Sequence, residues 1–190
     1  MSCTAPEPQQ EYLYVVVTQT GTILSRILKV ITHASYNHSS VSLDPTLGIL
    51  YSFGRKNAYN PFWGGFVQES PFFGTFKRFS ETEAVVLRFP VTLEQKTAVS
   101  RRLEYMYAHP RQYHYNTLGL FLAAFRIYWY REDYYYCSEF VKSVLLDSGV
   151  IREGDIDDIA KPMQFLDLPY GSVIYKGKLR LFAEQYSPSA

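Results

Sequence analysis

Hydrophobic residues change their spacing several times along this chain, and each change predicts a new strand or helix. Residues 12–18 (Tyr-Leu-Tyr-Val-Val-Val-Thr) form an apolar, β-branched run typical of a buried central strand. After a short polar break, Thr22 is a candidate N-cap, and apolar residues then recur every three or four positions from Ile23 to Ile31. That spacing predicts an amphipathic helix after the first strand.

The next pattern is a strict alternation that begins at His38. Val41 and Leu43 alternate with serines, so a strand here would place His38 on the same face as the serines. A turn at 44–48 then predicts an antiparallel return strand over 49–54. If Tyr51 and Phe53 share the apolar face of that strand, Ser52 shares the face of His38.

Residues 55–80 are rich in glycine, proline and aromatic side chains. Leaving so many aromatic rings in water would forfeit about 2 kcal/mol of burial free energy for each. We therefore expect a flap packed over the core or over a cleft, and packing for stability alone is an equal alternative. Residues 84–89 (Ala-Val-Val-Leu-Arg-Phe) predict a further strand that ends at Pro90.

Three helices are predicted in the second half of the chain. Thr92 and Gln95 form a capping-box pattern at the start of a helix that Pro110 stops after Tyr107. The stretch 118–129 is apolar on most sides, which predicts a buried helix. Phe140, Val141, Val144 and Leu145 recur at helical spacing before Gly149, so Cys137 lies at or just inside a helix N-terminus.

The C-terminal part predicts an acidic connector over 151–160 and a short helix over 161–166 with proline in its first turn. A closing hairpin is expected, with strands at 172–175 and 179–183. Strands that are neighbours in sequence and can pair antiparallel, mixed with helices, place the chain in the α+β class. We expect a disordered tail at 1–10 and a single domain at 11–190.

The composition of the chain excludes several classes of binding partner. The 190 residues carry a formal net charge of +1 and no long basic block, which argues against nucleic acid. Two cysteines make no disulfide framework, and there is no zinc-type cluster, so neither a metal nor a cofactor is expected. The first ten residues lack the features of a secretory signal, and no apolar run reaches the ~20 residues of a membrane span. The expected location is the cytoplasm, and the oligomeric state stays open.

Cys137 is the strongest candidate for a reactive residue. Unpaired backbone N–H groups and the positive end of the helix dipole stabilise a thiolate at this position. If the fold brings His38 over Cys137, the two form the thiolate–imidazolium pair of cysteine hydrolases. The alternative is a buried cysteine that serves as a small core residue.

Three stretches of the chain together resemble a known family. They are His38 at the head of a Ser-Val-Ser-Leu-Asp strand, the return strand Tyr51-Ser52-Phe53-Gly54-Arg55, and Tyr136-Cys137-Ser138-Glu139-Phe140-Val141. In this order they resemble the circularly permuted papain-fold cysteine hydrolases of the NlpC-type superfamily. The closest likeness is to the YiiX-like branch, in a group that also includes the lecithin:retinol acyltransferase type. The histidine strand precedes the cysteine helix in that group, as it does here.

The resemblance implies a permuted papain-like fold and thiol chemistry on an acyl bond. Cys137 would be the nucleophile, with its own backbone N–H in the oxyanion hole, and His38 would be the base. Ser52 falls where relatives often carry Glu, Asn, Gln or His to orient the imidazole. If the strand places its odd-numbered residues on the His38 face instead, Tyr51 would take this orienting role. Because a hydroxyl cannot offset the imidazolium charge as a carboxylate does, the base would be less firmly held.

The substrate within this group would be a small peptide, another amide or an acyl lipid. The missing export signal argues against a cell wall, and the aromatic segment favours a lipid-like or acylated substrate. The aromatic residues expected to bind it are Tyr51, Phe62, Trp63, Phe66 and Tyr136. The competing function is a binding module without catalysis that recognises an acylated or aromatic ligand through the same aromatic cleft.

Overall fold

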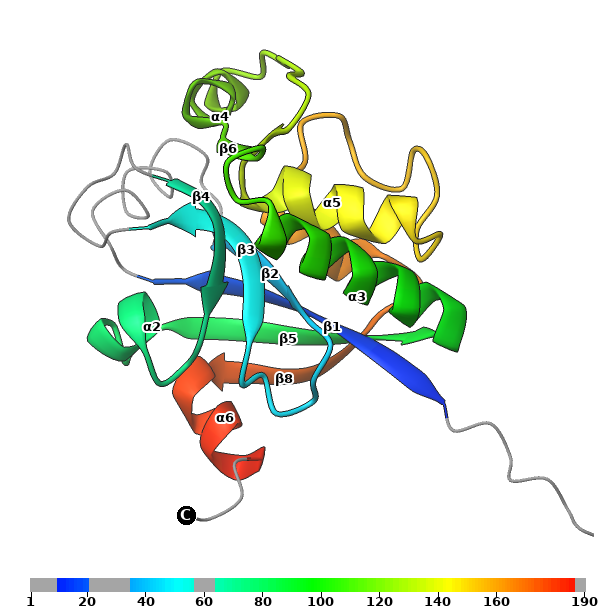
Figure 1. Ribbon diagram of the computed structural model, residues 1–190. Helices are drawn as coiled ribbons and strands as arrows, with labels where there is room; N and C mark the ends of the chain where they lie inside the picture. The colour runs from blue at the N-terminus through cyan, green and yellow to red at the C-terminus, as the bar shows by residue number, and fades with distance from the viewer. Residues whose placement is uncertain (1–9, 21–34, 57–63, 187–190) are drawn as a thin grey trace, which may run out of the picture.

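The computed structural model describes residues 10–20, 35–56 and 64–186 (Figure 1). The predicted helix over 22–31 and the predicted tail over 1–9 lie outside these residues. The described strands are β1 Glu11–Gln19, β2 His38–Ser42, β3 Leu50–Arg55, β4 Gly64–Glu69, β5 Glu83–Val91, β6 His114–Tyr115, β7 Tyr134–Tyr135 and β8 Ser172–Lys178. The described helices are α2 Gly74–Arg78, α3 Leu93–Ala108, α4 Thr117–Ala124, α5 Cys137–Asp147, the 3₁₀ helix η1 Pro162–Asp167 and α6 Leu179–Tyr186.

Six strands form one antiparallel sheet in the order β4-β3-β2-β1-β5-β8. The apolar run of β1 lies at the centre of the sheet, because β2 and β5 pair on either side of it. The pairing of β1 with β2 places Thr18 opposite His38. The expectation of an α+β protein with an antiparallel sheet and packed helices is therefore confirmed.

Helices cover both faces of the sheet. On one face α3 and α5 lie side by side, and Phe140 of α5 packs against Phe53 of β3 with ring centroids 5.3 Å apart (Figure 1). On the other face Phe76 of α2 and Phe182 of α6 pack over Val16 and the rest of a smaller cluster. Because β3 carries Phe53 toward α5, its neighbours Ser52 and Gly54 face the opposite side of the sheet.

Local sequence signals explain where two of these helices begin. Thr92 accepts a hydrogen bond from the Gln95 N–H at 3.1 Å while the Gln95 side chain accepts from the Thr92 N–H at 2.9 Å. This reciprocal pair is the predicted capping box of α3. The α5 helix begins at Cys137, as its apolar spacing predicts, and ends before Gly149, whose φ of 69° suits glycine.

The described part of residues 55–80 is more regular than the expected flap. Residues 64–69 form β4, which pairs along its whole length with β3, and 74–78 form α2. Strand β5 also continues through Pro90 instead of ending there, because Pro90 pairs with Tyr12. The pairing of β5 with β8 stops at Arg88, which leaves an open side for the proline, where a missing N–H breaks no ladder.

Two predictions for the second half were wrong. The apolar stretch after residue 117 is not a buried helix, because α4 ends at Ala124 and the residues after it are exposed. The closing hairpin is instead one strand, β8, followed by helix α6. Leu179, Phe182 and Ala183 are buried at helical spacing, and this packing onto the sheet outweighs their strand-like composition.

None of the helices in the described residues is long and apolar enough to cross a membrane.

Candidate active site

Cys137 is the first residue of α5, directly after the extended N-cap residue Tyr136. Its sulfur lies beside the beginning of β2, 3.9 Å from the carbonyl oxygen of Asn37. The backbone N–H groups of Ser39 and Ser138 are hydrogen-bonding partners of the sulfur. Only 5% of the cysteine is exposed. The thiol is therefore held in a buried site where two backbone donors and the helix N-terminus favour its anionic form.

His38 is the first residue of β2, and its imidazole and the Cys137 thiol are hydrogen-bonding partners. The ring nitrogen Nε2 lies 2.8 Å from Oε2 of Glu69, and both side chains are 16% exposed. With Nε2 engaged by the carboxylate, Nδ1 is the nitrogen left for the thiol. His38 and Cys137 are thus close enough to shift each other's pKa.

The pKa shifts of this pair follow from burial and from mutual charge. Burial alone lowers the pKa of His38, but the Glu69 carboxylate and the hydrogen bonds to Cys137 and Glu69 raise it well above 6.5. Burial alone raises the pKa of Cys137. The hydrogen bond and charge of His38, together with the two backbone N–H groups, lower it by more than burial raises it. Both shifts favour thiolate and imidazolium near neutral pH.

Ser52 lies where the strand parity predicts, on the same face of the sheet as His38. Its hydroxyl donates a hydrogen bond to the carbonyl oxygen of Ser39 at 3.0 Å and lies 3.3 Å from Nε2 of His38. Since its proton goes to Ser39, the Ser52 oxygen is free to accept from the imidazole. Glu69 is closer to the same nitrogen, so Ser52 is a second acceptor beside a carboxylate.

Glu69 is the member of the candidate site that the sequence reasoning missed. It is the last residue of β4, in a segment expected to be a flap, one strand beyond the strand searched for an orienting group. The alternation of Phe66 and Gln68 with Val67 and Glu69 could have revealed it, because Phe66 pairs with Phe53 and so puts Glu69 on the His38 face. A carboxylate supplies the negative charge that Ser52 lacks.

Gly54 makes room for this contact. A Cβ at this position would lie 3.3 Å from a Val67 methyl, 3.5 Å from Oε1 of Glu69 and 3.8 Å from Cε1 of His38. Gly54 therefore lies directly beneath the contact between Glu69 of β4 and His38 of β2, and a Cβ here would press most on Val67.

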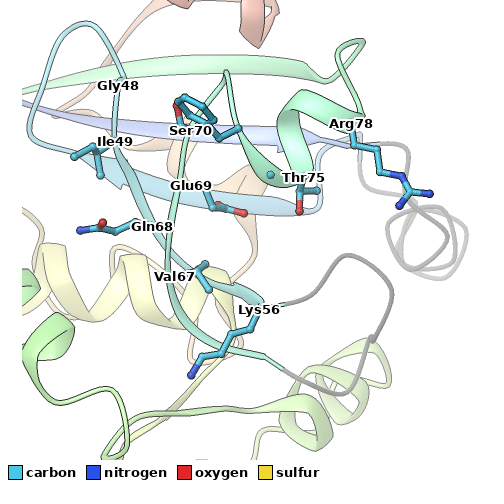
Figure 2. Close-up of a pocket in the computed structure, with 11 residues that line it drawn as sticks. Gly48, Ile49, Lys56, Val67, Gln68, Glu69, Ser70, Thr75 and Arg78 are labelled. Atoms are coloured by element: carbon cyan, nitrogen blue, oxygen red, sulfur yellow. The ribbon is translucent and has the colours of Figure 1, made fainter.

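A pocket of about 680 Å³ opens beside Glu69 (Figure 2). Figure 2 shows Glu69 near its middle, with Thr75 and Arg78 of α2 on one side and Lys56 nearer the end of β3. Neither Cys137 nor His38 lines this pocket. The pocket therefore reaches the carboxylate end of the site and not the sulfur.

The aromatic residues expected to bind substrate lie in different environments. Phe66 is 6% exposed and packs between Phe53 and Phe140, and Tyr51 stacks on it with a centroid distance of 6.1 Å. Tyr136 is 2% exposed. Phe62 and Trp63 lie outside the described residues. A role of these five side chains in substrate binding stays a prediction. Phe66 and Tyr136 are buried in the interior, and Tyr51 packs against it from a half-buried position.

The assembled groups are a thiol at a helix N-terminus, an imidazole in contact with it and a carboxylate on the far side of the imidazole. This order of groups can generate a nucleophile and hold the base in one orientation. Comparison of the chain with protein-family models, with curated proteins and with solved structures finds no match, so the interpretation of this site depends on its own geometry.

Proposed function

We propose that this protein is a thiol hydrolase that cleaves an amide or ester bond through a covalent acyl-enzyme on Cys137. The observation that carries the proposal is the series Cys137, His38 and Glu69, in which His38 lowers the pKa of the Cys137 thiol and its Nε2 lies 2.8 Å from Oε2 of Glu69. Thiol hydrolases require this order, because the base must both ionise the thiol and be held by a third group.

The steps follow from the geometry. The Cys137 thiolate attacks the acyl carbon, and a new carbon–sulfur bond forms as the carbonyl oxygen becomes an oxyanion. The backbone N–H of Cys137, which has no helical acceptor at this first position, is the expected oxyanion donor. The His38 imidazolium then gives its proton to the leaving amine or alcohol as the carbon–heteroatom bond breaks, and a thioester remains.

The second half of the cycle uses the same residues. Neutral His38 takes a proton from water, the resulting hydroxide attacks the thioester, and the carboxylic acid leaves as the thiolate returns. In both halves Glu69 accepts the Nε2–H of His38 and stabilises the positive charge on the ring. An imidazole without that carboxylate would be the weaker base.

The fold supports assignment to the permuted papain-like type. The strand that carries His38 precedes the helix that carries Cys137, the sheet is antiparallel, and α5 packs against β2 and β3. This is the arrangement that the sequence resemblance implies for an NlpC-type hydrolase. A substrate carbonyl reaches the sulfur only after neighbouring groups move, because 95% of Cys137 is covered.

The test is the pH dependence of Cys137 alkylation by iodoacetamide, measured by peptide mass in the native chain and in His38→Ala. With the ion pair, the rate should stay level well below the ~8.5 pKa of a free thiol. In the variant the thiolate fraction at pH 6.5 should fall to about 1%, so the rate should fall about 100-fold. Cys3 in the same chain serves as the internal reference.

A second measurement separates catalysis from thiol reactivity. Incubation with p-nitrophenyl acyl esters should release nitrophenol and add one acyl mass to Cys137, and Cys137→Ser should abolish both. If the Cys137 rate instead follows the pH dependence of Cys3 in both chains, the ion pair is absent. In that case the low exposure of Cys137 favours the binding module.

A further inference from the structure

The pocket of about 680 Å³ beside Glu69 has no part in the proposed reaction (Figure 2). Its described lining comes from the turn before β3, from Lys56 after β3, from β4 and from the turn that leads into α2. A volume of this size is within the range of sites that bind small organic molecules. We call it the β4–α2 pocket.

The side chains that line the β4–α2 pocket carry a net positive charge. Two of them, Lys56 and Arg78, are cationic, and Glu69 is the one acidic residue of the described lining. Figure 2 shows Glu69 between the two cations. The imidazole of His38 offsets the charge of Glu69, because its Nε2 lies 2.8 Å from the carboxylate and its pKa lies well above 6.5. The charges of Lys56 and Arg78 therefore decide what the pocket attracts near neutral pH.

Two other acidic residues of this region have partners outside the pocket. The carboxylate of Asp44 lies behind Gly48, where it accepts hydrogen bonds from Thr46 and from the Gly48 N–H. Glu81, which follows α2 in the chain, forms an ion pair with Lys178 at 2.5 Å. Neither acid lines the β4–α2 pocket, so neither cancels the charge of its two cations.

A glycine on β4 fixes the position of Lys56. A Cβ on Gly65 would lie 2.7 Å from Cε of Lys56 and 3.0 Å from its Nζ. The alkyl chain of the lysine therefore lies flat on the backbone of β4, in space that only a glycine leaves open. Gly65 pairs with Gly54, the residue beneath the contact between His38 and Glu69. The ammonium group is thus held one strand away from that ion pair.

Part of the lining is apolar and exposed. Phe73 is 69% exposed and Ile49 is 45% exposed, and both line the β4–α2 pocket. The turn that presents Phe73 is ordered, because the Phe73 N–H donates to the carbonyl oxygen of Ser70 at 3.2 Å. Gly74, the next residue, has a φ of 60°, a conformation that glycine adopts readily. An apolar group in the pocket would cover these two side chains.

We propose that the β4–α2 pocket binds a small organic anion. Lys56 or Arg78 would bind its phosphate or carboxylate group, and its apolar body would lie against Phe73 and Ile49. An uncharged apolar ligand would not use the two cations, and a cationic ligand would be repelled by them. An inorganic anion would leave the apolar side chains in water.

This proposal goes beyond the proposed hydrolase function and does not depend on it. The pocket reaches Glu69 and not the sulfur, so its ligand is an effector and not the substrate. Negative charge beside the ion pair favours the imidazolium form of His38, and by reciprocity the imidazolium favours binding of the anion. A probe without an acyl bond tests binding alone, so either proposal can fail while the other stands.

The experiment is isothermal titration calorimetry of the full chain with phenyl phosphate at pH 7. We expect saturable binding that weakens in high salt, and about tenfold weaker binding of inorganic phosphate, which lacks the apolar ring. The double variant Lys56→Met, Arg78→Met should bind phenyl phosphate at least about tenfold more weakly, because a charge-assisted hydrogen bond is lost. Phe73→Ser should lower the affinity for phenyl phosphate to about that for inorganic phosphate.

Each variant has a matched control outside the pocket. Lys176→Met, Arg101→Met removes the same charge from exposed positions on β8 and α3, and Phe125→Ser removes a phenylalanine that is 61% exposed. Both controls should bind phenyl phosphate like the native chain, and thermal unfolding should confirm that every variant is folded.

Three results would overturn the proposal. The first is absence of phenyl phosphate binding by the native chain. The second is an equal loss of binding in the two charge variants, which would show only a general attraction of anions to the protein. The third is equal affinity for inorganic phosphate and phenyl phosphate, because the apolar lining would then contribute nothing.

Discussion

Two glutamates near the candidate nucleophile are largely withdrawn from water, and their surroundings differ. Glu69 at the end of β4 faces the imidazole of His38, a group that can carry a positive charge, at 2.8 Å. Glu139 in the first turn of α5 receives its hydrogen bonds from neutral groups, the backbone N–H of Tyr136 at 3.1 Å and the side-chain amide of Asn116 at 3.5 Å. One carboxylate belongs to an ion pair and the other to a helix cap.

The two environments shift the pKa of different groups. Glu69 raises the pKa of its partner His38 and so keeps a charged pair inside the protein. At Glu139 burial raises the carboxyl pKa to about 7, despite the hydrogen bonds from Tyr136 and Asn116 and the charge of Lys142. At Glu139 the hydrogen bonds from Tyr136 and Asn116 and the charge of Lys142 do not offset the desolvation of the carboxylate.

The largest expected effect is at Glu69. Glu69→Ala removes the negative partner of His38, so the imidazolium and with it the thiolate are lost near neutral pH. We expect the Cys137 alkylation rate at pH 7 to fall by up to about 30-fold, because a thiol with the ordinary pKa of ~8.5 is only about 3% ionised at that pH. Because the pocket reaches the Glu69 side chain, added formate should restore part of the rate.

Glu69→Gln and Glu81→Ala are the controls for this prediction. The glutamine fills the same space, so formate should not help it, and Glu81 is a surface carboxylate paired with Lys178 whose loss should change nothing. An undiminished alkylation rate in Glu69→Ala would remove the distinction between the two glutamates.

A smaller effect is expected at Gly54, which tests whether Glu69 must pass close to β3. A methyl group from Gly54→Ala would press on a Val67 methyl at 3.3 Å, and a shift of Val67 would move Glu69, two residues further along β4, relative to Nε2. We expect about a tenfold fall in alkylation rate at pH 7, which corresponds to ~1.4 kcal/mol. Gly48→Ala meets an equally tight contact with Asp44 but lies away from His38, so it should keep the native rate.

The smallest effect is expected at Glu139, and it concerns stability. A carboxyl with a folded pKa of about 7, above its ordinary value, lends stability that is complete below pH 4.5 and is lost as the pH rises through 7. Glu139→Gln keeps an acceptor for the Tyr136 N–H but cannot ionise. Between pH 5 and 8 the melting temperature of the native chain should therefore fall by about 5–10 °C more than that of the variant. Equal falls in the two chains would show that Glu139 is already ionised at pH 5.

Part of this site could be predicted from the sequence because its signals are local. The helical spacing after Cys137 fixed the position of the sulfur at the start of α5, and the alternation around Val41 put His38 and Ser52 on one face. The Thr92 capping box likewise marked the start of α3. Each of these signals involves residues a few positions apart, whose geometry the backbone determines.

The rest depended on contacts between distant segments. Glu69 meets His38 because β4 pairs outside β3. The alternation within β4 gives the face of Glu69, but no local pattern shows which strand β4 pairs with. The apolar composition around Phe121 predicts burial, yet the position of α4 at the edge of the fold leaves it exposed. Leu179 and Phe182 look like strand residues until the sheet offers a face on which a helix can pack.

Asn116 connects the start of α4 to the first turn of α5. Its side-chain oxygen caps α4, and its amide donates to Glu139, whose carboxylate accepts the N–H just before Cys137. Its backbone N–H bonds to Tyr135 O, which closes the loop from 116 to 135 at its base. Any free energy that a ligand of α4 spends on ordering this loop would therefore be shared with the first turn of α5, and by reciprocity an acyl group on Cys137 would change the affinity for that ligand by the same factor.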